Sequence, residues 1–184
     1  MYLNIKRNFY YLIVIFSKKW LLIGIHNGIL WLERVESGKM FVGQSLHTLD
    51  DKQRVVLPSK ARVQLSSTIY LSFDLDHCIS IYSEKEYLEK AKHMNALDDF
   101  DKDSRTLKKI FFANSFEATV DKQGRLSLPK FLLEKARIAK EVVIVGAFDH
   151  LELYSVEKFA EVTKDQEDDY EALAQKVNTK RNGE

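Results

Sequence analysis

A nine-residue motif occurs twice in the sequence, and this duplication restricts the folds that the chain can adopt. The second copy covers residues 121–129 (DKQGRLSLP), and the first covers residues 50–58 (DDKQRVVLP), 71 positions earlier. Aligned on their prolines, the copies share an Asp, an Arg, a Leu and the Pro, and the chain has only two prolines. Residues 81–83 (IYS) and 153–155 (LYS) also correspond. Because this period exceeds those of solenoid repeats, we interpret the chain as two fused copies of one small unit.

Each copy is predicted to form a β-hairpin followed by a short helix. In the second copy, residues 116–120 and 125–128 alternate apolar and polar side chains, as half-buried strands do. Residues 121–124 between them favour a turn, because Asp bonds its own backbone and Gly adopts left-handed conformations. The proline ends the strand and is tolerated in the first turn of a helix, expected at 130–136. In both copies the Arg of the motif should face outward and the residue after it inward.

The elements predicted downstream of Met40 occur twice in the same order: a hairpin, a short helix, two strands and a helix. The hairpins are expected at about 43–57 and 115–128. Residues 141–146 (EVVIVG) form the most apolar predicted strand and should be central. This order predicts an α+β fold of two homologous units. The boundaries are an N-terminal extension outside the fold at 1–39, unit 1 at 45–88, linker helices at 89–114, unit 2 at 115–158, and a C-terminal helix and tail at 159–184.

Residues 1–39 differ in composition from the rest of the chain. The apolar run at 9–16 is too short to span a membrane, because two lysines end it. A second apolar run covers 20–32, and no convincing cleavage site of a signal peptide follows either run. Three interpretations stay open: a membrane-associating extension, a packed extra element, or sequence upstream of the native start. We favour the third, because the orderly pattern begins at Met40.

The overall charge does not by itself indicate a nucleic-acid-binding protein. The composition is that of a soluble globular protein, with 45% hydrophobic and 30% charged residues. Residues 1–39 hold six Lys/Arg and two Glu, which leaves 22 of the 28 Lys/Arg and 25 of the 27 Asp/Glu for residues 40–184, a net charge of −3. A DNA-binding surface must therefore be a local patch rather than a basic domain.

We find no arrangement of residues typical of catalysis, and we predict no enzyme activity, no metal site and no cofactor. Cys78 is the only cysteine, so nothing indicates disulfides or an oxidising compartment, and its apolar strand favours a place in the core. The five histidines lack metal-ligand spacing. The four aspartates in 98–103 lack the spacing of a calcium loop and favour a solvated linker. A small metal-dependent hydrolase is kept only as a remote alternative.

Binding through the hairpin turns is better supported than catalysis. A two-stranded ribbon can enter the DNA major groove, where the planar fork of Arg can bond O6 and N7 of guanine, while Lys binds phosphate. The alternative is that Asp and Arg, four residues apart, only form an ion pair that closes the turn. The recurrence of the motif in both units weakens this alternative without removing it. The cations at the two turns are Lys52, Arg54, Lys122 and Arg125.

At these motifs the sequence resembles the MraZ family of bacterial transcriptional regulators. Residues 40–43 (MFVG) resemble that family's amino terminus. Residues 47–54 (HTLDDKQR) resemble its first Asp-x-x-x-Arg signature, 57–62 (LPSKAR) the segment that follows, and 120–129 its second signature. The resemblance covers residues 40 to about 160.

The resemblance implies two swapped-hairpin, SpoVT–AbrB-like β-barrel units with short helices, related by a pseudo-two-fold axis. It further implies a cytoplasmic, nucleoid-associated, ring-shaped homo-oligomer that binds double-stranded DNA at direct repeats upstream of cell-division and cell-wall genes. No membrane and no small-molecule ligand are expected. The residues that would face DNA by position are Lys52, Arg54, Lys122 and Arg125. The rival interpretation is a self-assembling structural protein whose hairpin arginines only hold subunits together.

The sequence departs from the family pattern in two places. The family usually has Gly where this chain has Gln53, whose counterpart in the second motif is Gly124. A left-handed backbone at Gln53 would cost on the order of 1 kcal/mol. Residues 1–39 have no counterpart in the family, which supports the upstream-sequence interpretation.

Overall fold

The computed structural model describes residues 10–16, 19–26, 29–35, 40–65, 68–164 and 170–182. The chain divides into two compact units, residues 1–39 and residues 40–184, and each is described by itself. The first unit is a three-stranded antiparallel sheet in the order β1-β2-β3. Its strands are β1 (Tyr10–Phe16), β2 (Lys19–His26) and β3 (Ile29–Val35). The interpretation of this segment as upstream sequence stays a prediction.

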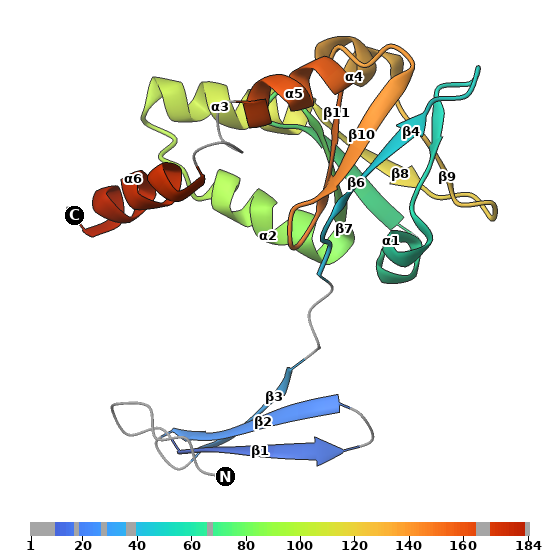
Figure 1. The fold of residues 1–184 in the computed structure, drawn as a ribbon. Helices are drawn as coiled ribbons and strands as arrows, with labels where there is room; N and C mark the ends of the chain where they lie inside the picture. The colour runs from blue at the N-terminus through green and yellow to red at the C-terminus, as the bar shows by residue number, and fades with distance from the viewer. Residues whose placement is uncertain are drawn as a thin grey trace. The chain divides into compact units, whose positions relative to one another are not determined.

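The second unit contains the same series of elements twice, as the duplicated sequence predicts (Figure 1). The first copy consists of β4 (Gln44–Thr48), β5 (Arg54–Val56), α1 (Ser59–Gln64), β6 (Thr68–Phe73), β7 (Ile79–Ser83) and α2 (Glu84–Asn95). The second consists of β8 (Ser115–Thr119), β9 (Arg125–Ser127), α4 (Lys130–Lys135), β10 (Glu141–Gly146), β11 (Leu151–Tyr154) and α5 (Val156–Lys164). Between the copies lies α3 (Lys102–Ala113), and α6 (Tyr170–Asn182) follows the second. No helix among the described residues is long and apolar enough to cross a membrane.

The two copies exchange strands instead of folding side by side. The large sheet has the order β4-β10-β11-β7-β6-β8, and a separate ribbon pairs β5 with β9. The local hairpin pairing predicted at 43–57 and 115–128 is therefore wrong beyond the turns, since both arms pair with strands of the other copy. The swapped-hairpin α+β class is confirmed. The edges β4 and β8 are not paired with each other in the described part of the chain, so the barrel closure implied by the resemblance is not seen there.

A pseudo-two-fold axis relates the copies. In the sheet it passes between β7 and β11, where Ser80 lies opposite Glu152. In the ribbon it passes between Val55 and Leu126, which are also partners. The most apolar predicted strand, now β10, is interior because it pairs with β4 on one side and β11 on the other.

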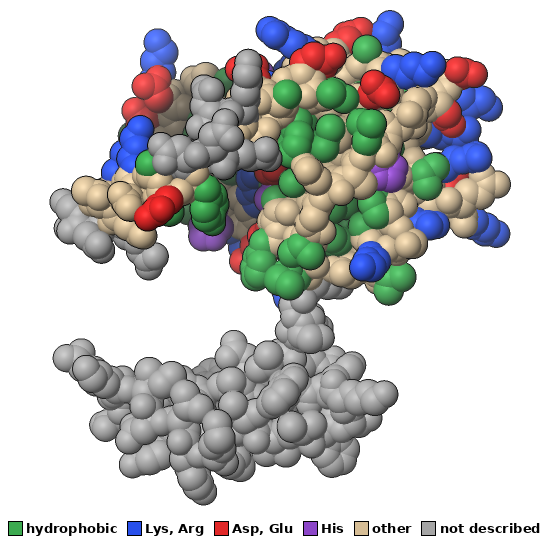
Figure 2. Space-filling view, in the orientation of Figure 1, with side chains coloured by type: hydrophobic (Ala, Val, Ile, Leu, Met, Phe, Trp, Pro, Cys, Tyr) green, Lys and Arg blue, Asp and Glu red, His purple; other side chains and the backbone are tan. Residues whose placement is uncertain are grey.

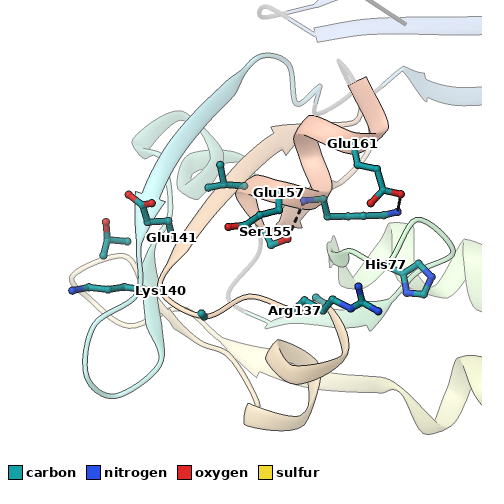
Figure 3. Close-up of a pocket in the computed structure, with 12 residues that line it drawn as sticks. His77, Arg137, Lys140, Glu141, Ser155, Glu157 and Glu161 are labelled. Atoms are coloured by element: carbon teal, nitrogen blue, oxygen red, sulfur yellow. Dashed lines mark hydrogen bonds and ion pairs between the residues drawn. The ribbon is translucent and has the colours of Figure 1, made fainter. Parts of the chain in front are cut away.

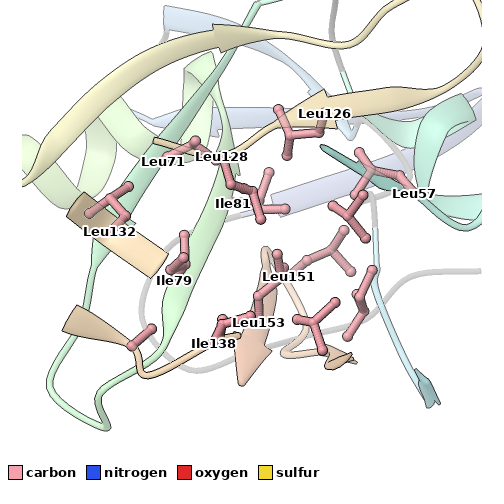
Figure 4. Close-up of a cluster of buried hydrophobic side chains, with 14 of the residues drawn as sticks. Leu57, Leu71, Ile79, Ile81, Leu126, Leu128, Leu132, Ile138, Leu151 and Leu153 are labelled. Carbon is pink, nitrogen blue, oxygen red and sulfur yellow. The ribbon is translucent and has the colours of Figure 1, made fainter. Parts of the chain in front are cut away.

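The core fills the space between the sheet and the ribbon with aliphatic side chains from both copies (Figure 4). Val55 and Leu126, which follow the two motif arginines, are both 0% exposed, so the predicted inward positions are confirmed. Burying an aliphatic side chain of this size contributes roughly 1.5–3 kcal/mol to the stability of the fold. The ribbon is therefore fixed to the body of the unit, and its outer face has a defined orientation.

The aspartates between the copies have structural partners. Asp101 caps α3 by accepting a hydrogen bond from the Ser104 N–H at 2.7 Å. Asp99 forms an ion pair with Lys108 at 2.6 Å. Two of the carboxylates in residues 98–103 therefore have structural roles, one in the segment before α3 and one at the start of that helix.

Candidate nucleic-acid interface

Asp50 organises the first tip, which we define as residues 50–54. Its Oδ1 accepts hydrogen bonds from the backbone N–H groups of Lys52 (2.9 Å) and Arg54 (3.0 Å). Its Oδ2 accepts one from Nε of Arg54 (2.8 Å) and lies 2.7 Å from Nη2 of the same guanidinium. The side-chain hydrogen bond from Arg54, joined by the backbone donors, lowers the pKa of Asp50 to about 2. The ion pair considered as the alternative to binding is thus present at the first tip.

The second tip, residues 121–125, has the same turn without that ion pair. Oδ1 of Asp121 accepts hydrogen bonds from the backbone N–H groups of Gln123 (2.8 Å) and Arg125 (2.9 Å). The backbone N–H of Arg125 is the main cause that lowers the pKa of Asp121. Among the hydrogen bonds and ion pairs of the described residues, none engages the guanidinium of Arg125. This guanidinium is available to a ligand.

Both turns need a left-handed residue at the position before the arginine. Gly124 has φ +79°, and Gln53 has φ +59°. The left-handed conformation expected for Gln53 is confirmed. For a side chain this backbone is strained, because Cβ lies too close to the following carbonyl oxygen.

The strand exchange places both arginines on the outer face of one ribbon. Arg54 lies opposite Ser127, and Arg125 lies opposite Val56, so the arginines are diagonal neighbours. Diagonal positions of a sheet are about 7–8 Å apart. Lys52 and Lys122 are exposed in the turns. The two tips project from the same side of the second unit (right in Figure 1), where Lys and Arg side chains gather at the margin of the space-filling view (Figure 2).

One cation near the tips, Arg62 of α1, was not predicted from the sequence as a site residue. A Cβ built on Gly124 would lie 2.3 Å from Nη1 and 2.4 Å from Cδ of Arg62, so this side chain lies directly against the second tip. The contact joins segments far apart in the sequence, and no periodicity of the chain indicates it. The glycine itself was the only local signal.

The cavity drawn in Figure 3 does not have the features of a catalytic centre. Its volume is about 1090 Å³, and its lining mixes cations with carboxylates. Lys158 pairs with Glu161 at 3.0 Å, and Ser155 Oγ accepts the Lys158 N–H at 3.1 Å as a helix cap. No group of three or more potential metal ligands occurs in the part of the chain that the structure describes.

Cys78 has the core position expected for it. It is 1% exposed, and burial raises the pKa of its thiol to about 12. The nucleophilic form of cysteine is the thiolate, which this environment disfavours. A nucleophilic role is therefore disfavoured for the only cysteine of the chain.

The fold and the two tips define a duplicated, strand-exchanged α+β protein with arginines on a shared ribbon. The family model described as "MraZ protein, putative antitoxin-like" matches residues 40–110 and 111–180. The chain belongs to the MraZ family, which confirms the resemblance found in the sequence.

Relatives named "Transcriptional regulator MraZ" match most of the chain. The protein of Moorella thermoacetica is 36% identical over 138 residues, which is 75% of this chain and 96% of that protein. The protein of Halothermothrix orenii is 36% identical over 135 residues, covering 73% and 94% of the two chains. The protein of Clostridium tetani is 35% identical over 139 residues, covering 76% and 97%.

Proposed function

We propose that this protein is a transcriptional regulator that binds double-stranded DNA through the β5–β9 ribbon and its two tips. The observation that carries the proposal is the position of Arg54 and Arg125 as diagonal neighbours on the outer face of one ribbon. The names of the relatives support the regulatory role. Residues 40–184 carry a net charge of −3, so the cations at the two tips have to supply this unit's attraction to DNA.

The proposed binding mode inserts the ribbon into the major groove, which is wide enough for two strands. Arg125 has a free guanidinium that can bond O6 and N7 of a guanine. Arg54 has five N–H donors, and Asp50 engages only its Nε and Nη2, so Nη1 is still available. In this mode Asp50 orients Arg54 toward the base, while Lys52 and Lys122 bind phosphates.

The two tips of one subunit offer too few contacts with DNA for tight binding. We therefore propose that several subunits bind together. Linking tips in one rigid assembly raises the effective concentration and can increase affinity by ~10²–10⁴. A ring with head-to-tail interfaces presents its tips in the same sense along the DNA. The operator should then consist of direct repeats about 10 bp apart. The resemblance to the MraZ family supports operators upstream of cell-division and cell-wall genes, and a cytoplasmic, nucleoid-associated protein.

A footprint on the region upstream of the protein's own gene tests this function. The proposal predicts protection of repeated boxes, and stronger binding to three in-phase boxes than to one box or to three boxes separated by an extra ~5 bp. Light scattering should give a mass well above that of a dimer. Equal affinity for one and three boxes would reject the ring.

The ion pair at the first tip favours a second candidate, a self-assembling structural protein in which the arginines have no DNA to bind. Binding to random duplex DNA at low salt separates the two candidates. A DNA-binding protein retains a salt-dependent, non-specific affinity. A structural protein without a DNA-binding surface should show none.

A further inference from the structure

The second tip carries a side chain from another element that covers its glycine. Gly124 is buried although it lies at the end of a turn. A Cβ at this position would lie 2.3–2.7 Å from Nη1, Cδ and Cζ of Arg62. Real Cβ atoms do not approach other atoms this closely, so the glycine leaves the space that the Arg62 side chain occupies.

The guanidinium of Arg62 has no electrostatic partner in the described part of the chain. Arg62 is exposed, and its side chain takes part in none of the hydrogen bonds or ion pairs there. The guanidinium of Arg125 in the adjacent turn also makes no hydrogen bond or ion pair among the described residues, although its charge interacts with that of Asp121. The second tip therefore presents two unpaired guanidinium groups in addition to Lys122.

The first tip has no equivalent of this arrangement. The counterpart of Arg62 in the second copy, 71 residues later, is Leu133, which is buried at 4% exposure. The arginine of the first tip, Arg54, is paired with Asp50. The pseudo-two-fold symmetry of the backbone is thus broken by the charges on the two tips.

We propose that Arg62 is a further DNA-contacting residue, which binds a backbone phosphate beside the second tip and makes this tip the stronger of the two. The inference rests on the proposed DNA-binding function. Arg62 comes from a helix at the side of the ribbon, so it meets the rim of the groove when the ribbon enters it. Phosphate oxygens line that rim, and contacts to them set position and orientation without reading sequence. The guanidinium fork fits a phosphate with two parallel hydrogen bonds.

The test measures the affinity of the full chain for the DNA upstream of its own gene and for a scrambled duplex, across a salt series. Arg62→Met removes the charge but keeps an unbranched side chain against Gly124. Lys109→Met removes an exposed charge from α3, on the opposite side of the unit in Figure 1, and serves as the matched control. Arg62→Lys restores the charge. Melting temperature and mass are measured for each variant to establish that it is folded and assembled.

Arg62→Met should weaken binding to both DNAs by the same factor, about fivefold for each engaged tip near 0.15 M salt, and reduce the salt slope by about 0.9 per tip. Arg62→Lys should retain most of the affinity, and Lys109→Met should match the unmodified protein. If the unmodified protein binds DNA while Arg62→Met keeps the same affinity and salt slope, the proposed role of Arg62 is wrong. The proposed DNA-binding function would still hold in that case. A loss confined to the upstream DNA would also overturn the phosphate role. No binding by the unmodified protein would reject the proposed function itself, and the role of Arg62 with it.

Discussion

Gln53 and Gly124 occupy equivalent places in two turns and share a left-handed backbone, with φ of +59° and +79°. Only the glycine adopts this conformation without steric cost. The two turns are otherwise closed alike, by a carboxylate that accepts two backbone N–H groups. Of the two turns, only the first therefore holds a side chain at a positive φ.

Gln53→Gly should stabilise the protein. Removing a strained side chain at positive φ is expected to contribute about 1 kcal/mol, which raises Tm by roughly 2–4 °C. Gly124→Gln should lower Tm, because it puts a side chain at φ +79°. Thermal melting of both variants checks the prediction. An unchanged or lower Tm for Gln53→Gly would mean that the turn bears no strain at this residue.

Asp50→Asn should reduce sequence discrimination while leaving the turn intact. An amide oxygen can still accept the backbone hydrogen bonds, but the ion pair that orients Arg54 is weakened. Asp121→Asn removes the same charge from a tip without such a pair and is the matched control. We expect the ratio of operator to scrambled affinity to fall several-fold for Asp50→Asn only. Equal ratios for the two variants would show that Asp50 does not orient Arg54 for base recognition.

His150 should make stability depend on pH. Burial lowers the pKa of this ring, but hydrogen bonds to Glu152 (3.2 Å) and Asp149 (2.6 Å) outweigh burial and raise the pKa above 6.5. A raised folded-state pKa means that the protonated ring stabilises the fold. This contribution is fully present below pH 6.5 and is lost as the pH rises through the folded-state pKa.

Melting of the unmodified protein and of His150→Gln at pH 5.5 and pH 8.5 tests this dependence. The Tm difference between the two proteins should be larger at pH 5.5. The ring also stacks on that of Tyr82, with the two ring centroids 4.6 Å apart. A Tm difference that is constant, or larger at pH 8.5, would contradict the assignment.

Residues 1–39 should be dispensable. They form a separate compact unit and lie outside both segments matched by the family model. A shortened chain that begins at Met40 should fold, assemble and bind DNA like the full chain. Light scattering and DNA binding of the two chains compare these properties directly. Loss of solubility or of DNA affinity on shortening would show that this segment has a role in the native protein.

Local patterns predicted the parts of this fold that depend on local chemistry. Period-two alternation identified Val55 and Leu126 as inward, and the alignment of the motifs identified the left-handed Gln53. The exchange of strands could not follow from the residues, because alternation defines which face of a strand is buried but not which strand is its partner. The resemblance supplied that feature.

The inequality of the two tips could not be predicted either. The two motifs share their Asp and Arg, yet Arg54 has an ion pair and Arg125 has none among the described residues. The contact between Arg62 and Gly124 joins α1 of the first copy to the turn of the second. Such contacts arise from packing between copies, and their residues carry no common pattern along the sequence.

Direct recognition of DNA by the two ribbon arginines is tested most directly by one measurement. Affinities of the Ala variants of Arg54, Arg125, Lys52 and Lys122 are compared on operator and scrambled DNA across a salt series. Each Arg variant should lose roughly 1–3 kcal/mol on the operator and much less on scrambled DNA. Each Lys variant should weaken both DNAs equally and flatten the salt dependence. Arg variants that lose operator and scrambled binding in equal proportion, or lose neither, would contradict base recognition by the tips.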